Sequence, residues 1–275
     1  MPPSPTRFAL LIIVAAALLV PAASADAATS VSSNWAGYVA TPTSSATKFK
    51  TVSGTWIVPQ GDCSLLTTGY SAAWVGIGGY KSSSHALEQI GTEFDCVRGT
   101  AKYSAWYELV PDAGHDISMT VRPGDKIDAA VTVKGTRVTV YLRNRTLGKI
   151  FQKTSTMKSP DTSSADWIVE APSTCNDAGL CAQLPISNFG TIAFAHASAT
   201  TAKGTKGSIS DPHWSNTEIT LSQGGGRFAR FDSQGAQPSA LSPDGTGFTV
   251  AYAEQAPSDN PAPPIVDPGA GVPLP

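Results

Sequence analysis

The feature that most constrains the fold is a repeated alternation between short β-patterned runs and turn residues. It is clearest from Ile117 to Leu142, where Pro123-Gly124-Asp125 and Lys134-Gly135-Thr136 separate three such runs. Strand, turn, strand, turn, strand is an antiparallel meander. No convincing long amphipathic helix occurs in the chain. We therefore expect an all-β protein with roughly a dozen or more strands, arranged as a two-sheet sandwich or a barrel.

The meander predicts strands at Ile117–Val121, Ile127–Val133 and Val138–Leu142. The expected strands elsewhere share short apolar runs bounded by turn residues, and they are Trp35–Val39, Phe49–Val58, Ala72–Ile77, Leu87–Phe94, Tyr103–Val110, Asp166–Glu170, Phe189–Ala195, Glu218–Leu221, Phe228–Phe231 and Phe248–Tyr252.

The two ends of the chain differ from this pattern. Arg7, the apolar stretch Phe8–Val20 and the small residues Ala23-Ser24-Ala25 form a secretory signal peptide, which predicts cleavage near residue 25 and a secreted protein. After Ala253 prolines and glycines accumulate, which predicts a disordered tail over residues 256–275. Residues 26–255 can form one β domain.

Charge excludes several classes of partner. The formal net charge is −2 and 15% of residues are charged. Cleavage of the signal removes one basic residue, Arg7, and no acidic one. No basic patch is left to track nucleic acid or an anionic membrane, so we expect neither partner.

The four cysteines predict disulfides, because an even count in an exported chain favours pairing. Three pairings are possible. The short spacing between Cys175 and Cys181 favours a pinned loop, which leaves Cys63 to pair with Cys96. No spacing fits a zinc site and the four histidines are scattered, so we expect no metal and no cofactor.

Familiar nucleophile motifs are missing. The chain has no Gly-x-Ser-x-Gly elbow. Asp161-Thr162-Ser163 and Asp232-Ser233-Gln234 both lack the glycine that follows Asp-Thr/Ser in pepsin-like enzymes. Carboxyl and amide groups among tryptophans remain as the candidates for chemistry.

Strand parity groups these candidates, because side chains alternate between the two faces of a strand. Gln89 and Glu93 share one face of their run, Trp106 and Glu108 share a face of theirs, and Glu170 follows Ile168 on another. Such faces suit the floor of a groove. The same alternation also occurs on ordinary strand faces that combine surface and core residues, so both interpretations stay open. A buried carboxyl group needs a partner or a raised pKa, and a general acid or base needs the same setting.

Five segments in order resemble the glutamic peptidase family (eqolisins), and the resemblance runs from about Ser33 to Ala253. The segments are Ser33-Asn34-Trp35-Ala36-Gly37, Ala73-Trp74-Val75-Gly76-Ile77, Gln89-Ile90-Gly91, Ala105-Trp106-Tyr107-Glu108 and Trp167-Ile168-Val169-Glu170. The resemblance implies a β-sandwich of two bent antiparallel sheets, of the concanavalin-like or jelly-roll type, with a groove on one concave face.

The same resemblance implies peptide-bond hydrolysis by a catalytic dyad of Gln89 and Glu170. Glu170, ionised at rest, would take a proton from the attacking water and return it to the leaving nitrogen. The Gln89 amide would hold the water and stabilise the oxyanion. Supporting or substrate-binding positions are Trp35, Trp74, Trp106, Glu108 and Glu93. The expected partners are polypeptide substrates, and the expected state is a monomer.

Three positions depart from the fungal pattern of this family: Gly78 and Ser104 stand where that pattern has acidic residues, and Glu93 replaces an Asp. Two other functions stay open. One is a non-catalytic secreted β-sandwich that binds glycan or protein through exposed tryptophans. The other is a glycoside hydrolase that uses Glu108 and Glu170 as its two carboxylates.

Overall fold

The computed structural model describes residues 27–44, 46–64, 68–175, 181–223 and 233–255, which contain strands and no helix. The expected signal peptide and Pro-rich tail therefore lie outside the described residues. In chain order the strands are β1 (Ala28–Ser32), β2 (Trp35–Pro42), β3 (Phe49–Ile57), β4 (Thr68–Gly78), β5 (Leu87–Val97), β6 (Thr100–Val110), β7 (His115–Ile117), β8 (Lys126–Lys134), β9 (Arg137–Asn144), β10 (Lys149–Thr156), β11 (Ala165–Glu170), β12 (Ser173–Cys175), β13 (Cys181–Gln183), β14 (Thr191–Thr201), β15 (Lys206–Gly207), β16 (Trp214–Gln223), β17 (Ser233–Pro238) and β18 (Phe248–Gln255).

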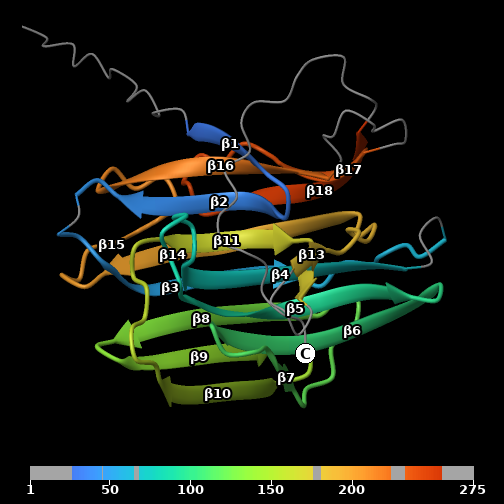
Figure 1. The fold of residues 1–275 in the computed structure, drawn as a ribbon, viewed down its shortest axis with the longest axis horizontal. Helices are drawn as coiled ribbons and strands as arrows, with labels where there is room; N and C mark the ends of the chain where they lie inside the picture. Colours follow the sequence, from blue (N-terminus) through green and yellow to red (C-terminus); the bar gives the residue numbers. More distant parts are fainter. Residues whose placement is uncertain (1–26, 45, 65–67, 176–180, 224–232, 256–275) are drawn as a thin grey trace, which may run out of the picture.

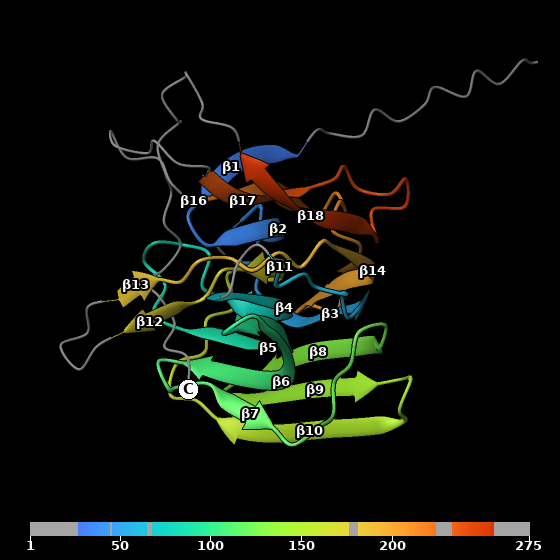
Figure 2. The same ribbon diagram turned by 90° about the vertical axis from the view of Figure 1, so that its right-hand side faces the viewer.

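The strands form two layers that are joined along one side. The hydrogen-bonded order is β10-β9-β8-β3-β14-β18-β17-β16-β2-β11-β4-β5-β6-β7, and the path folds back on itself between β18 and β16. Figure 1 shows β2, β11, β4, β5 and β6 stacked in that order, and Figure 2 shows β8, β9 and β10 beside them as the second layer. All pairs in this path are antiparallel, while β1 pairs with β16 in parallel. The expected all-β sandwich is confirmed.

Most expected strands are confirmed, with β14 starting at Thr191 rather than Phe189. The strand expected at Ile117–Val121 is wrong beyond its first residue. β7 ends at Ile117, where the Met119 N–H turns back to donate to the Ile117 carbonyl at 2.6 Å. Residues 228–231, expected as a strand, lie outside the described residues.

The core between the layers is apolar and is fixed by two tryptophans. Trp56 on β3 donates its indole N–H to Thr92 Oγ1 on β5 at 2.9 Å, and Trp167 on β11 donates to the Ser53 carbonyl on β3 at 2.8 Å. Both rings are buried. Because a buried indole N–H needs an acceptor, these two bonds fix how the layers lie against each other.

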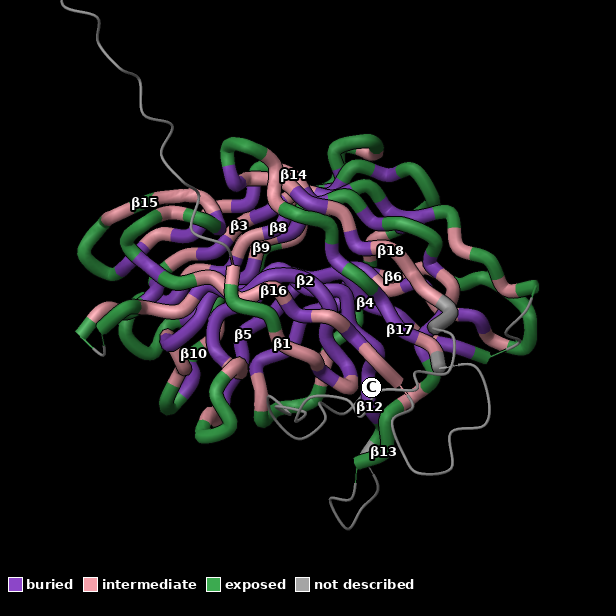
Figure 3. The backbone as a smooth tube through the Cα atoms, turned by 90° about the horizontal axis from the view of Figure 1, so that it is seen from above, coloured by how far each residue is buried: buried purple, intermediate pink, exposed green. Residues whose placement is uncertain are grey.

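The expected Cys63–Cys96 pairing is confirmed, whereas the expected Cys175–Cys181 pairing stays a prediction. Cys63 and Cys96 form a disulfide with their Cα atoms 5.4 Å apart. Cys181 is also disulfide-bonded, and Cys175 lies opposite it in the β12–β13 register. Figure 3 shows this hairpin extending away from the buried centre of the molecule.

The described residues contain no helix that could cross a membrane.

Candidate active site

The register of five neighbouring strands places the candidate residues on one face. Glu170 on β11 lies opposite Trp35 on β2 and Ala72 on β4. Gln89 on β5 lies opposite Gly76 on β4 and Glu108 on β6. β11 and β5 are the two neighbours of β4, so both dyad candidates flank the same strand.

Trp74 occupies the position between the two dyad candidates. It lies on β4 opposite Ile168 on one side and Gly91 on the other. A Cβ atom at Gly91 would lie 2.7 Å from Trp74 Cβ, and one at Gly76 would lie 2.8 Å from its ring. Glycine at both positions therefore leaves the space that the indole fills. Gln89 and Glu170 form no hydrogen bond with each other, and the row that contains Trp74 separates them.

A buried apolar cluster surrounds this face and is distinct from the core between the layers. Its members include the three expected tryptophans, Trp35, Trp74 and Trp106, together with Ile168. The rings of Trp35 and Trp74 meet edge to face with centroids 5.1 Å apart. The faces that parity predicted are thus confirmed, and the tryptophans form apolar walls around the polar groups.

Gln89 is held by Glu108. Its Nε2 donates to Glu108 Oε2 at 2.7 Å, and both side chains are fully buried. This bond uses one of the two N–H groups on Nε2, so the other N–H remains available as a donor. Glu108, expected as a supporting residue, therefore orients the Gln89 amide.

Glu170 is held by two donors, one on β4 and one in the connection between β1 and β2. Trp74 Nε1 donates to its Oε2 at 2.8 Å, and Asn34 Nδ2 donates to its Oε1 at 3.4 Å. Ser32 Oγ in turn donates to Asn34 Oδ1 at 2.9 Å, which orients the Asn34 amide. Both carboxyl oxygens are thus fixed in a side chain that is 3% exposed.

Glu93 contributes a third carboxyl group to the same face. It lies opposite Ala72, which is also the partner of Glu170 in the register. Ser104 Oγ donates to Glu93 Oε2 at 2.7 Å. Ser104 and Glu93 both depart from the fungal pattern, and they are joined to each other by this hydrogen bond.

Burial raises the pKa of the three buried glutamates Glu170, Glu108 and Glu93. It raises the pKa of Glu170 to about 7, against the opposing effect of the Trp74 N–H. It raises the pKa of Glu108 to about 8, opposed by the Gln89 N–H and reinforced by the charge of Glu170. The pKa of Glu93 is also raised by burial.

Several buried polar atoms of the site have no hydrogen-bond partner in the protein. They are Gln89 Oε1, Glu108 Oε1 and Trp106 Nε1. Buried polar groups are almost always bonded in folded proteins, and leaving one unbonded costs about 1–3 kcal/mol. Their concentration around the dyad indicates a face prepared for polar groups of a bound molecule or for water.

Sequence reasoning did not single out Asn34 and Ser104 as site residues. Asn34 stands directly before Trp35 in one of the five matched segments, which is the signal that could have found it. Ser104 lies opposite Glu93, a relation that only the β5–β6 register reveals. Among the described residues, no group of three or more His, Cys, Asp or Glu side chains could hold a metal ion.

The fold and the site define a two-layer β protein whose sheet face carries buried amide and carboxyl groups among tryptophans. The sequence profile of the Peptidase A4 family matches residues 33–234, and the chain belongs to this family, the glutamic peptidases or eqolisins.

Two curated relatives and two solved structures are similar to the chain. Scytalidopepsin B of Scytalidium lignicola is 33% identical over 165 residues, which cover 58% of this chain and 60% of the relative. Aspergillopepsin-2 of Aspergillus niger is 31% identical over 144 residues, which cover 50% of this chain and 48% of the relative. The chain thus spans less than two thirds of either curated relative.

The structural matches extend further. The crystal structure of scytalido-glutamic peptidase with a transition state analogue inhibitor matches 80% of this chain and 98% of its own, with a TM-score of 0.65 and 26% identity. Aspergilloglutamic peptidase from Aspergillus niger matches 67% of this chain and 99% of its own, with a TM-score of 0.55 and 28% identity.

Proposed function

We propose that the protein is a secreted, monomeric endopeptidase that hydrolyses peptide bonds in acid with Gln89 and Glu170 as its catalytic residues. The observation that carries the proposal is the arrangement around Trp74. On one side of its row a carboxyl group is held at both oxygens, and on the other side an amide is oriented with its oxygen unpartnered. Membership in a family of peptidases supports the same reaction.

In this mechanism the scissile peptide and one water lie over Trp74, between the two residues. Ionised Glu170 removes a proton from the water while the water oxygen bonds to the peptide carbonyl carbon. The free N–H of Gln89 donates to the developing oxyanion, and such a donor contributes on the order of 3 kcal/mol to lowering the barrier. The carbon–nitrogen bond then breaks, and Glu170 gives its proton to the leaving nitrogen.

Glu170 is expected from the sequence to be ionised in the resting enzyme, and the raised pKa of this residue changes that expectation. With a pKa of about 7, Glu170 carries a proton in most molecules at acid pH. The reactive form falls about tenfold for each pH unit below that value. Glu108, with a pKa of about 8, stays protonated over the same range and adds no negative charge beside the oxyanion. Within the acid range, activity should therefore be higher in weak acid than in strong acid.

Digestion of denatured casein by the purified protein, across a pH series and with pepstatin present, tests the proposal. We expect cleavage below neutral pH that pepstatin does not stop, because the Asp-Thr/Ser-Gly pair of pepsin-like enzymes is absent from the sequence. Complete inhibition by pepstatin, or intact casein at every pH, would reject it. Intact casein together with binding to a glycan array would favour the non-catalytic alternative.

A further inference from the structure

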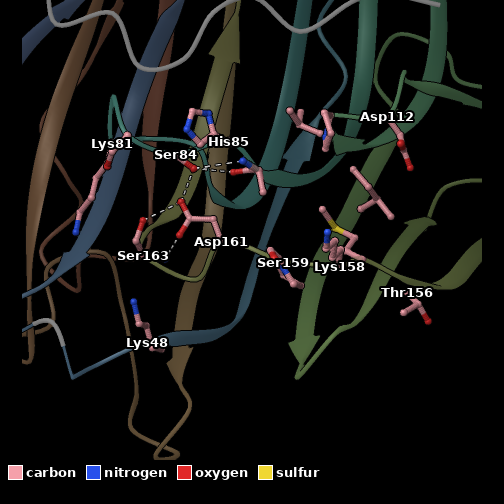
Figure 4. Close-up of a pocket in the computed structure, with 17 residues that line it drawn as sticks. Lys48, Lys81, Ser84, His85, Asp112, Thr156, Lys158, Ser159, Asp161 and Ser163 are labelled. Carbon is pink, nitrogen blue, oxygen red and sulfur yellow. Dashed lines mark hydrogen bonds between the residues drawn. The ribbon is translucent and has the colours of Figure 1, made fainter.

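A cavity lies at one end of the layer that carries the dyad. It has a volume of about 730 Å³ and is formed by four segments. They are the end of the connection from β2 to β3, the connection from β4 to β5, the end of β6 with the turn after it, and the segment that joins β10 to β11 (Figure 4). We call it the lysine pocket, after Lys48, Lys81 and Lys158 in its lining. Neither Gln89 nor Glu170 lines it.

The lysine pocket concentrates positive charge in a chain whose net charge is −2. Its three lysines are exposed, and none of them forms an ion pair with any residue that the structure describes. His85 also lines the pocket, and histidine is the side chain that gains positive charge on acidification. In Figure 4 the amino group of Lys81 lies to the left of the hydrogen-bonded cluster around Asp161, and that of Lys48 lies below it.

The acidic residues that line the pocket form no ion pair with these lysines. Asp161 accepts hydrogen bonds from neighbouring serines. Ser84 Oγ donates to its Oδ2 at 2.5 Å, and Ser163 Oγ and the Ser163 N–H each donate to it at 2.9 Å. Asp112 is exposed at the rim. Glu88 lies behind the pocket and accepts the Asp161 N–H at 3.1 Å, and burial raises its pKa to about 9, so it carries no charge in acid.

The position of the pocket links it to the dyad. Val110 lines it and also packs against the buried cluster that contains Trp74 and Trp106. Along β6 Val110 is two residues beyond Glu108, the partner of Gln89, which corresponds to about 7 Å of strand. A polypeptide bound over the dyad reaches the pocket with a side chain only a few residues from the scissile bond.

We propose that the lysine pocket is a specificity subsite that binds an acidic side chain of the polypeptide substrate. The inference rests on the proposed peptidase function and adds a substrate preference to it. The carboxylate of a substrate Asp or Glu binds among unpaired lysines, while the floor of the pocket, which includes Ala86 and Met157, takes its methylene groups.

The preference has a characteristic pH dependence. Free Asp and Glu side chains ionise near pH 4. Below that pH a substrate Glu is neutral and offers the lysines little more than Gln does. Above it, the carboxylate gains the attraction of Lys48, Lys81 and Lys158, reinforced by His85 and opposed by Asp112 and Asp161. Selectivity for Glu over Gln therefore grows as the pH rises past about 4.

Matched peptides test the proposal. Pairs that differ only by Glu or Gln, at each position up to three residues from the cleaved bond, are compared by kcat/KM at about pH 3 and about pH 6. At one position we expect Glu to be preferred about threefold to tenfold at the higher pH and equal to Gln at the lower. The double variant Lys81→Met/Lys158→Met should lose that preference and still cleave the Gln peptide at the parent rate.

Lys102→Met is the matched control, because Lys102 is exposed on β6 and does not line the pocket. It should keep the preference. Equal cleavage of all Glu and Gln pairs, or a preference that survives in the double variant, would overturn the subsite while leaving the peptidase in place. Cleavage of neither peptide, with the protein folded, would remove the peptidase function and the subsite with it.

Discussion

Two buried amide–carboxyl pairs in this protein have the same hydrogen-bond length and different surroundings. Gln89 Nε2 donates to Glu108 Oε2 at 2.7 Å, and Asn144 Nδ2 donates to Asp125 Oδ2 at 2.7 Å. In the second pair Asn144 Oδ1 also accepts the Leu147 N–H at 3.1 Å. Neither member of the Asn144 pair has a buried atom without a partner, whereas Gln89 Oε1 and Glu108 Oε1 both lack one.

The difference separates a structural role from a chemical one. The Asn144 pair closes the turns at the ends of β8 and β9, and its hydrogen bonds stabilise the fold. The hydrogen bond from Gln89 to Glu108 orients the Gln89 side chain, but Gln89 Oε1 and Glu108 Oε1 stay buried without a partner. Each such atom lowers the free energy of unfolding by about 1–3 kcal/mol. Sites that bind and transform ligands often keep such unfavourable groups. The predictions below use the Asn144 pair as a reference.

The largest effect is expected for Glu170→Gln, which keeps the shape of the side chain and removes the proposed base. kcat/KM should fall at least about a thousandfold, because positioned acid–base groups contribute factors of this size. Glu108→Gln should lose much less, since Glu108 only orients Gln89. The assay is peptide cleavage by variants whose fold is checked by circular dichroism. The reverse order of the two losses would assign the catalytic carboxyl group to Glu108.

Gln89→Ala should lower kcat/KM about a hundredfold, the size expected for one lost oxyanion donor. Its melting temperature should fall less than that of Asn144→Ala, because loss of the buried and unpartnered Oε1 offsets part of the cost of leaving Glu108 Oε2 without its donor. Asn144→Ala should show the opposite pattern. It should destabilise the fold by about 1–3 kcal/mol and leave kcat/KM of the folded enzyme unchanged. Kinetics and denaturant unfolding of both variants check this pairing, and a similar stability loss in both would remove the distinction between them.

Thermodynamic stability should decrease as the pH rises. Burial raises the pKa of Asp95 to about 7, of Glu108 to about 8 and of Glu88 to about 9, whereas unfolded Asp and Glu titrate near pH 4. Between these values the folded state binds more protons than the unfolded state, so the free energy of unfolding falls with rising pH. Melting temperatures at about pH 4 and about pH 8 measure the decline.

Glu88→Gln should reduce that decline, because burial is the main cause of the Glu88 shift and a glutamine there does not titrate. Glu88 lies outside the dyad face, so the variant separates fold stability from catalysis. A parent protein that melts at a higher temperature at pH 8 than at pH 4 would contradict the assigned burial effects.

Much of the site could be predicted from local sequence, because the two-residue period of a strand fixes which side chains share a face. It placed Gln89 with Glu93, and Glu170 with Ile168. The period says nothing about which strands are neighbours. The hydrogen bonds from Asn34 to Glu170 and from Ser104 to Glu93 depend on pairings between distant segments, so they emerged only from the register.

Two further features were inaccessible to sequence reasoning for the same reason. The lysine pocket gathers side chains from four separate segments of the chain, and no local pattern marks it. The strand expected at Ile117–Val121 had suitable residues, but the turn at Met119 ended it after Ile117. Contacts between distant parts of the chain form the pocket, whereas local turn geometry outweighed strand propensity at Met119.

The most direct test of the account is the pH dependence of kcat/KM in Trp74→Phe, compared with Trp106→Phe. Trp74 Nε1 donates to Glu170 Oε2, whereas Trp106 Nε1 has no partner. Loss of the Trp74 donor destabilises the Glu170 carboxylate and raises its pKa, so the acid limb of the profile should move to higher pH by roughly one unit. Trp106→Phe should leave the limb where the parent has it. If the limb keeps its position in Trp74→Phe, with the fold confirmed at each pH, ionisation of Glu170 does not control catalysis.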